Sequence, residues 1–356
     1  MYCVIMAGGK GSRFWPRSRA ALPKQLLDIF SDKSMIQETV ERVAGMVPPG
    51  RIVIVTGGEH AEAIYQQLPE IPRENILIEP IGRNTAPCIC MAALWVEKKE
   101  PGAIMAVLPA DHHIGAPHEF CCCLESAAEA ALQLDALVTI GIAPRSPETG
   151  YGYIQYGKET GAYNGLAAYR VQQFHEKPAL AKAREFLAQG NFLWNSGMFI
   201  WKAATILSEI KTYLPEMYSA LAAVVPQLGT AQAQQTMDAA YHAIESISID
   251  YGVMEKSAKV VILKGDFGWS DVGSWSAVYD ISEKDAQGNV VHGDVISVDT
   301  NGSFIYSKKK LTAVVGLDDI VIVETDDALL VCAKDRVQDV KKVVDILEQQ
   351  GKKKYL

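Results

Sequence analysis

A glycine-rich stretch near the amino terminus contains the residue types that bind polyphosphates. It follows an apolar run and consists of small residues, Gly8, Gly9, Gly11 and Ser12, before a cation, Arg13. Glycine lets backbone amides approach a phosphate closely, and the guanidinium adds a positive charge. Phe14 stands where GxGxxG has its third glycine, and GxxxxGK[ST] occurs nowhere in the chain. These departures disfavour a dinucleotide-dependent oxidoreductase.

A carboxylate follows a second apolar run. Asp111 comes directly after residues 104–110, a run that reads as a strand. A carboxylate at a strand exit that faces bound phosphates is a natural Mg²⁺ ligand, because Mg²⁺ completes its shell with phosphate oxygens and water. An isolated aspartate in such a place more often caps a turn or a helix, so the position alone leaves both interpretations open.

The cysteines offer a competing metal site. There are seven, and the run Cys121 to Cys123 lies near three histidines, His112, His113 and His118. If residues 119–134 form a helix, consecutive thiols point about 100° apart and cannot converge on one tetrahedral ion. The odd number of cysteines, with no CxxC pair, also argues against a disulfide framework and favours a reducing compartment.

The elements that must position these residues alternate along the first two-thirds of the chain. Apolar runs predict five strands, at 2–6, 52–56, 76–79, 104–108 and 137–142. Helical periodicity predicts four helices, at 35–46, 61–68, 85–98 and 120–134. This alternation is typical of an α/β domain with a Rossmann-like, mixed but mostly parallel sheet and helices on both faces, where ligands bind beyond the carboxyl ends of the strands.

The sequence pattern changes after about Asn289. Short β-rich runs at 295–299, 303–306, 312–315, 320–324 and 329–332 are separated by turn residues, and an amphipathic helix follows at 336–349. We therefore predict two domains, a catalytic domain at 1–285 and a β-rich carboxyl-terminal domain with a terminal helix at 286–356. The helix has one apolar stripe, formed by Val337, Val340, Val344 and Leu347, which needs a covering surface.

The composition of the chain limits the kinds of partner that it can bind. The chain has 356 residues and a formal net charge of -8, with 49% hydrophobic residues and no long apolar span. A net negative charge gives no general attraction to nucleic acid or to anionic membranes, so we expect neither as a partner. We expect a cytoplasmic protein that binds a small phosphorylated ligand.

The glycine-rich stretch continues into a longer signature. The segment from Gly8 to Gln25 ends in Pro23-Lys24-Gln25 and resembles the sugar-nucleotide pyrophosphorylase family, in its mannose-1-phosphate guanylyltransferase branch. That resemblance implies a nucleotidyltransferase core like that of the glycosyltransferase-A fold, with Arg13 and Lys24 on the nucleotide triphosphate. Without it, Lys24 would read as a surface lysine after a proline turn.

Further resemblances follow in the order that the family shows them. Residues 79–87 resemble its base-recognition segment, which implies that Asn84, Thr85 and Ala86 bind guanine, although Asn84 or Thr85 could equally cap the next helix. Residues 175–178 and 193–199 resemble its sugar-phosphate motifs. They imply sugar binding by Glu176 and Asn195 and phosphate contact by Lys177. The same resemblance implies that the turn Gly150-Tyr151-Gly152 lets the backbone approach the sugar, so Gly150 is a further sugar-binding residue. In isolation, Glu176 and Lys177 would read as an exposed charge pair.

The last resemblance lies at residues 268–275, where Asp271 matches the family's second magnesium ligand beside Asp111. The resemblance covers about residues 1–285. It implies a Mg²⁺-assisted, in-line attack of α-D-mannose 1-phosphate on the α-phosphorus of GTP, which yields GDP-mannose and pyrophosphate. Catalytic roles fall to Arg13, Lys24 and Lys177. A homodimer is expected, with residues after about Asn289 in its interface.

Two alternatives remain beside the oxidoreductase. One is the same transfer with another base or sugar, such as uridylyl or thymidylyl transfer to glucose 1-phosphate. The other is a non-catalytic homologue that binds sugar nucleotide. The segment 82–87 disfavours the first, and the presence of Lys24, Asp111 and Asp271 together disfavours the second.

Overall fold

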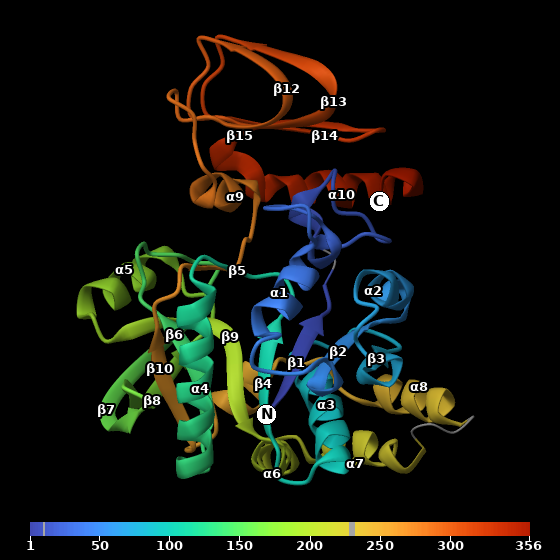
Figure 1. The fold of residues 1–356 in the computed structure, drawn as a ribbon, viewed down its shortest axis with the longest axis vertical. Coiled ribbons are helices and arrows are strands. Elements are labelled where there is room, and N and C mark those ends of the chain that lie inside the picture. The colour runs from blue at the N-terminus through green and yellow to red at the C-terminus, as the bar shows by residue number, and fades with distance from the viewer. Residues whose placement is uncertain (10, 228–231) are drawn as a thin grey trace. The chain divides into compact units, whose positions relative to one another are not determined.

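The computed structural model describes residues 1–9, 11–227 and 232–356 (Figure 1). The chain forms two compact units. Unit 1 consists of Met1–Gly8, Val40–Ala110 and Ile114–Trp269. Unit 2 consists of Gly9–Thr39, Asp111–His113 and Ser270–Leu356. Lys10, within the glycine-rich stretch, lies outside the described residues.

Unit 1 contains a nine-stranded sheet in the order β3-β2-β1-β4-β9-β6-β10-β8-β7. Strands β3, β2, β1 and β4 are parallel, as are β6 and β10, while β9 runs antiparallel between β4 and β6. The bounds are β1 Tyr2–Ala7, β2 Ile52–Gly57, β3 Ile76–Glu79, β4 Ile104–Pro109, β6 Leu137–Ile142, β7 Tyr153–Tyr163, β8 Leu166–His175, β9 Phe192–Lys202 and β10 Val260–Gly265. The five predicted strands are confirmed, and the sheet is mixed as expected.

Helices cover both faces of this sheet. Val4 of β1 belongs to the core that includes α3, α6 and α7, whereas its neighbour Cys3 faces the side where Arg42 and Cys121 lie. Successive strand residues point to opposite faces, so both sides are packed. The helices are α1 Met35–Val43, α2 Ala61–Gln67, α3 Thr85–Lys99, α4 Pro117–Leu134, α5 Leu180–Gln189, α6 Ala203–Tyr213, α7 Pro215–Ala222 and α8 Ala233–Ala243.

The predicted helix at the cysteine run is confirmed as α4. Along it Cys121 is partly buried, Cys122 is exposed and Cys123 is buried, so the three thiols point in different directions. All seven cysteines are free thiols. In the described part of the chain, no group of three or more His, Cys, Asp or Glu side chains is placed to hold a metal ion.

Unit 2 contains a four-stranded sheet in the order β12-β13-β14-β15. Its elements are β12 Val290–Val298, β13 Phe304–Val315, β14 Ile320–Glu324, β15 Leu329–Ala333, α9 Trp275–Ile281 and α10 Val340–Gln349. The short strands β5 His113–Ile114 and β11 Trp269–Ser270 pair with each other. The predicted runs 303–306 and 312–315 form the single strand β13, because the lysine run between them stays extended with its side chains in solvent. The predicted terminal helix begins as a 3₁₀ turn at Lys334–Asp339 before α10.

The core of unit 2 joins the amino-terminal signature to the carboxyl-terminal strands. The Phe14 and Trp275 rings lie 4.9 Å apart, and the Trp275 and Phe304 rings stack at 5.4 Å. Val337 and Val340 of the predicted stripe are each 2% exposed in this core, and Val344 and Leu347 pack against it. The stripe is therefore covered by the same unit. The domain limits 1–285 and 286–356 remain a prediction from sequence, since compactness groups residues 9–39 with 270–356.

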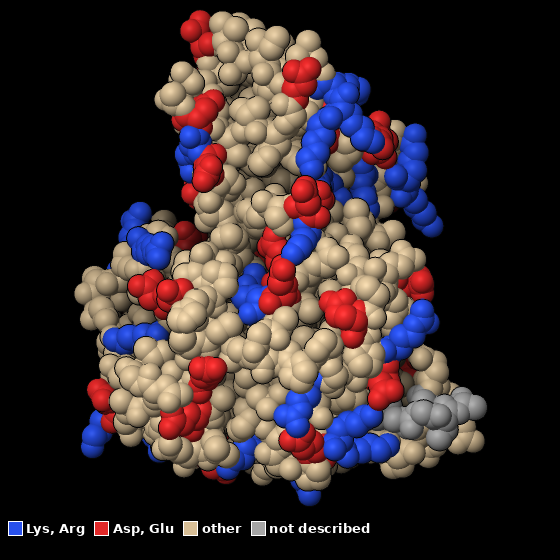
Figure 2. Space-filling view, viewed as in Figure 1, with Lys and Arg blue, Asp and Glu red and all other residues tan. Residues whose placement is uncertain are grey.

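On the face drawn in Figure 2, Lys and Arg are scattered among Asp and Glu over most of the surface, with more Lys and Arg toward the upper right. This mixture accords with the modest net charge of -8. Over the residues that the structure describes, no helix is both long and apolar enough to cross a membrane.

Candidate active site

A polar pocket of about 270 Å³ lies within unit 2. It brings together four predicted site residues, Arg13, Lys24, Asp111 and Asp271. Its other lining residues are Gly11, Ser12, Phe14, His112, Val272 and Gly273. Cations, carboxylates and a glycine turn in one pocket match what a nucleotide triphosphate requires.

Lys24 holds the centre of this pocket. Its side chain is 6% exposed, and Nζ lies 3.0 Å from Oδ2 of Asp111. Nζ also donates a hydrogen bond of 2.6 Å to the backbone oxygen of Asp271. A buried ammonium is stable only with such partners, so Lys24 is a fixed internal cation and not a surface lysine.

The glycine turn owes its shape to Lys24. Gly11 has φ 59°, and a Cβ there would lie 2.4 Å from Cβ of Lys24, so no other residue fits. The Ser18 hydroxyl fixes the turn by donating to the Gly11 oxygen at 2.7 Å. Gly9 has φ 102°, and Gly8 ends the exit from β1 in unit 1. The predicted glycine-rich turn is thus built to pack on the lysine that follows it.

Asp111 is poised as an anion. Burial raises the pKa of its carboxyl group, but the Lys24 ammonium, His112 and hydrogen bonds outweigh burial and hold the pKa below its ordinary value. Asp111 is one-third exposed, at 33%, and so faces the pocket. Its carboxylate and that of Asp271 line the same space. Two carboxylates beside a phosphate site form a donor set that suits Mg²⁺.

The Asp271 turn carries backbone strain. Val272 has φ 49° although its side chain is β-branched and fully buried. Such a conformation costs about 1–3 kcal/mol and persists only where the surroundings enforce it. At Gly273 a Cβ would lie 3.1 Å from Oδ2 of Asp271, so the glycine leaves room for the carboxylate. The strain marks this turn as one whose shape matters for function.

The predicted base-recognition residues lie in unit 1 at the start of α3. Asn84 is the N-cap, and its Oδ1 accepts from the Thr85 amide at 2.8 Å. The Thr85 hydroxyl accepts from the Ile249 amide at 2.9 Å, and the Ala86 amide donates to the Ile247 oxygen at 3.1 Å. The capping interpretation is confirmed. Base contact by Asn84, Thr85 and Ala86 stays a prediction.

The predicted sugar residues also gather in unit 1. The backbone amide of Asn195 donates to the backbone oxygen of Gly152 at 2.8 Å, and a Cβ on Gly152 would lie 2.6 Å from Oε2 of Glu176. Lys177 pairs with Glu176 at 3.0 Å and is 64% exposed. Nothing lies within 4 Å of a Cβ on Gly150, so Gly152 is the glycine whose neighbours require it.

Sequence reasoning gave no role to two acidic residues of unit 1, although one of them, Glu79, opens the predicted base-recognition segment. Oδ1 of Asp250 accepts from Asn195 Nδ2 at 2.7 Å. Burial and the nearby Glu176 carboxylate raise the pKa of Asp250 to about 6, against the Asn195 hydrogen bond. Burial also raises the pKa of Glu79 to about 7, although Tyr241 donates to it. Neither residue stands in a glycine turn, and only long-range contacts reveal their environments.

Comparison with known proteins now defines the class. Residues 2–288 match the nucleotidyl transferase family, and residues 293–347 match the mannose-phosphate isomerase/GMP-like β-helix domain. The chain is therefore a nucleotidyl transferase with the fold of that family.

Individual relatives narrow the class. A mannose-1-phosphate guanylyltransferase of Escherichia coli is 41% identical over 100% of this chain and 75% of its own length. A xanthan biosynthesis protein of Xanthomonas campestris is 43% identical over 98% of this chain and 73% of its own. A crystal structure from Thermus thermophilus, described as a mannose-1-phosphate geranyltransferase, is 35% identical with a TM-score of 0.88, covering 98% of this chain and 99% of that one. The chain belongs to the mannose-1-phosphate guanylyltransferase family and is an enzyme of that family.

Proposed function

We propose that the chain transfers GMP from GTP to α-D-mannose 1-phosphate and releases pyrophosphate. The observation that carries this proposal is the buried Lys24, paired with Asp111 and bonded to the Asp271 backbone in one polar pocket. Two relatives, at 41% and 42% identity, are named mannose-1-phosphate guanylyltransferases, and these names support the choice of guanine and mannose.

The chemistry requires little from the protein beyond placement and charge. An oxygen of mannose 1-phosphate is already ionised near neutral pH, so it can attack the α-phosphorus of GTP without a strong general base. The obstacle is repulsion between two anions, which fixed cations and backbone amides offset. Arg13, Lys24 and the turn at Gly11 would hold the triphosphate, and Lys177 would hold the sugar phosphate.

Asp111 and Asp271 fit a Mg²⁺ ion, which would neutralise phosphate charge when bound. The lowered pKa of Asp111 keeps its carboxylate ionised for that role. Lys24 lines the same pocket, and its ammonium offsets part of the negative charge there through its ion pair with Asp111.

The two recognition groups of unit 1 would choose the substrates. Guanine presents N–H donors beside an oxygen acceptor, which Asn84, Thr85 and the Ala86 backbone can complement. Glu176, Asn195 and the backbone near Gly150 can accept or donate to sugar hydroxyls. A site built to bond a hydroxyl rejects sugars that place it elsewhere, because buried polar groups are then left unpaired.

We also propose a homodimer, through the exposed face of β12 and β13. Ile296 and Val298 on β12 lie beside Ala313 and Val315 on β13, with Leu311 on the same face by strand alternation. Leu311 and Val315 are 60% and 65% exposed. A row of apolar side chains in water is typical of a surface that another subunit covers, and two-fold pairing is the commonest arrangement. A cytoplasmic location is proposed as well, supported by the seven free thiols.

One assay tests the proposed function. The protein is incubated with Mg²⁺, each of four nucleoside triphosphates and a panel of sugar 1-phosphates, and pyrophosphate is measured. GTP with mannose 1-phosphate should give the highest kcat/KM, and Asn195→Ala should reduce the preference for mannose over glucose. Preference for UTP or dTTP with glucose 1-phosphate would overturn the substrate assignment, and no turnover with any pair would favour the non-catalytic homologue.

A further inference from the structure

A carboxylate outside every sequence motif is aimed at the candidate sugar site. Oδ1 of Asp250 accepts a hydrogen bond of 2.7 Å from Nδ2 of Asn195. Oδ1 of Asn195 is itself fixed by the Gly197 amide at 3.1 Å. These two bonds settle which way the Asn195 carboxamide faces, because its oxygen and its nitrogen each have a partner.

Asp250 opens a rare element. It is the first residue of a π-helix, Asp250–Met254, whose next residue, Tyr251, is 48% exposed while Val253 and Met254 are buried. Single π turns cost stability and are found disproportionately at functional sites. The wide turn points the Asp250 side chain toward Asn195 while the segment that follows it stays in the core.

The residues just before Asp250 are tied to the start of α3. The Ile249 amide donates to the Thr85 hydroxyl at 2.9 Å. At Ile247 the amide donates to the Arg83 oxygen at 3.2 Å, and the oxygen accepts from the Ala86 amide at 3.1 Å. Three hydrogen bonds therefore fasten residues 247–249 to the predicted base-recognition turn. Asp250, one residue further on, carries that attachment to Asn195.

We propose that Asp250 is a positioning residue that orients Asn195 for the sugar, and that residues 247–250 couple this orientation to the base-recognition turn at Arg83–Ala86. The inference rests on the proposed function, because it assumes that Asn195 binds the sugar and that Thr85 lies beside the guanine base. Asp250 acts through Asn195, so its loss weakens sugar recognition more than nucleotide recognition.

The surroundings of Asp250 make an ionised carboxylate costly there. Burial and Glu176 both disfavour its ionised form, as the raised pKa records. Glu255, in the same stretch, also disfavours the ionised form of Asp250. Lys177, which pairs with Glu176, acts on the neighbouring Tyr251. A neutral amide at position 250 would keep an acceptor for Asn195 without this repulsion, which makes Asp250→Asn an informative conservative change.

Binding measurements test the proposal independently of turnover. The Kd of GDP-mannose and that of GDP, which lacks the sugar, are measured by calorimetry for the wild type, Asp250→Ala and Asp250→Asn. Asp250→Ala should weaken GDP-mannose by about tenfold while GDP changes by less than about threefold. Asp250→Asn should restore most of the loss. Equal losses for both ligands would indicate a merely structural role and overturn the proposal, as would an Asp250→Ala variant that binds GDP-mannose normally.

The coupling has its own test in a double-mutant cycle. Thr85→Val removes the acceptor for the Ile249 amide at nearly constant volume, and Thr85→Ser retains it. Thr85→Val should weaken GDP-mannose relative to GDP by about threefold, and the double variant with Asp250→Ala should be no weaker in that ratio than Asp250→Ala alone. Independent, multiplicative effects on the ratio would refute the coupling.

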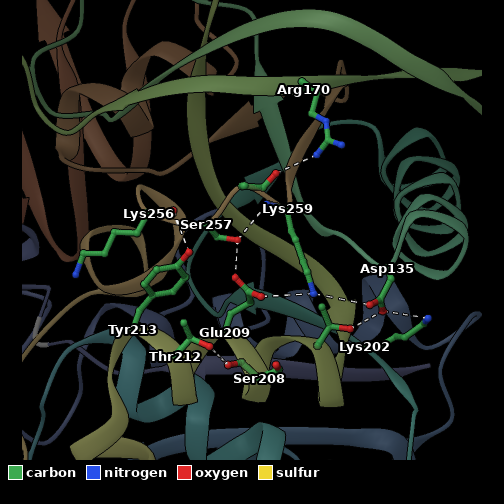
Figure 3. Close-up of polar contacts among 12 residues, drawn as sticks. Asp135, Arg170, Lys202, Ser208, Glu209, Thr212, Tyr213, Lys256, Ser257 and Lys259 are labelled. Atoms are coloured by element: carbon green, nitrogen blue, oxygen red, sulfur yellow. Dashed lines mark hydrogen bonds and ion pairs between the residues drawn. The ribbon is translucent and has the colours of Figure 1, made fainter.

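A matched control comes from another buried carboxylate of unit 1. Glu209 accepts from the Ser257 hydroxyl at 2.7 Å and pairs with Lys259 at 3.5 Å, in a network that Figure 3 shows between α6 and the start of β10. Glu209→Gln should leave the ratio of the two Kd values unchanged. The pyrophosphate-release assay distinguishes failure of the proposed function from failure of this proposal. If the wild type prefers another sugar 1-phosphate, the proposed function fails. The Asp250 and Thr85 variants are then measured with the sugar nucleotide made from the preferred substrates.

Discussion

The ammonium of Lys24 lies 3.0 Å from the Asp111 carboxylate and donates a hydrogen bond of 2.6 Å to the backbone oxygen of Asp271. Both aspartates therefore contact the same cation. The Asp111 carboxylate balances the charge of Lys24, and the Asp271 backbone oxygen helps to fix the position of the ammonium. The Asp111 carboxylate is therefore expected to contribute to stability as well as to catalysis.

Asp111→Asn and Asp271→Asn should each lower kcat by about a hundredfold or more, because each removes a carboxylate that would bind Mg²⁺. Asp111→Asn should also lower the free energy of unfolding, because it leaves the buried Lys24 charge without the carboxylate that lies 3.0 Å from it. Steady-state pyrophosphate release and urea unfolding measure the two effects. Near-normal kcat in both variants would refute the magnesium assignment, and an Asp111→Asn variant that unfolds with the wild-type free energy would show that the ion pair is not stabilising.

Lys24→Ala should weaken activity far more than Lys10→Ala. Lys24 is buried at 5% exposure in the pocket and stands in the Pro23-Lys24-Gln25 match, to which Lys10 does not belong. Loss of a preorganised cation at a phosphate site is expected to cost about a hundredfold in kcat/KM for GTP. The measurement is kcat/KM for GTP in each of the two variants. Similar losses would mean that the lysine that meets the phosphates was misidentified.

Leu311→Asp and Val315→Asp should convert the proposed dimer to a monomer. Both side chains are exposed on β13, so a charge there does not enter a core, but it would be buried in a dimer interface without a partner. Ile346→Asp on α10, an apolar residue 49% exposed in the same unit, is the matched control. Light scattering gives the mass. A wild-type monomer rejects the dimer, and a dimer that survives both β13 substitutions places the interface elsewhere.

Point variants test the proposed dimer better than a truncation near Ser282, which would remove the carboxyl-terminal strands. Trp275 of α9 stacks on Phe304 of β13, and Phe14 packs on Trp275. Removal of the carboxyl-terminal strands would therefore expose the core that supports the Gly11 turn. A truncated chain would lose activity for this reason alone.

The sequence predicted the local elements well because period and turn chemistry are local. The strand at Ile76–Glu79 matches its prediction at both ends, and Gly11 was recognised as a turn glycine, although its fit against Lys24 was not. The attachment of Phe14 and Trp15 to a core that includes Val321 and Val340 could not be predicted, because it joins residues about 300 apart and leaves no local pattern. Asp250 was missed for the same reason: its partner Asn195 is 55 residues away, on another element.

Glu79 offers a last prediction, on pH. Burial raises its pKa from 4.5 to about 7, so the folded state keeps the proton where the unfolded chain has already lost it. Between those two values the folded state binds more protons, and the free energy of unfolding therefore falls as pH rises, until the loss is complete above about pH 7.

Glu79→Gln removes the titrating group but keeps an acceptor for the Tyr241 hydroxyl, which donates to Oε1 of Glu79 at 3.0 Å. Relative to the wild type, the variant should gain stability between about pH 5 and pH 8, by an amount on the order of 3 kcal/mol for a shift of this size. Urea unfolding of both proteins at the two pH values measures the gain, with Glu62→Gln on the exposed side of α2 as the control for the substitution itself. A difference that stays constant with pH, or that reverses sign, would show that Glu79 is ionised in the fold at its ordinary pKa.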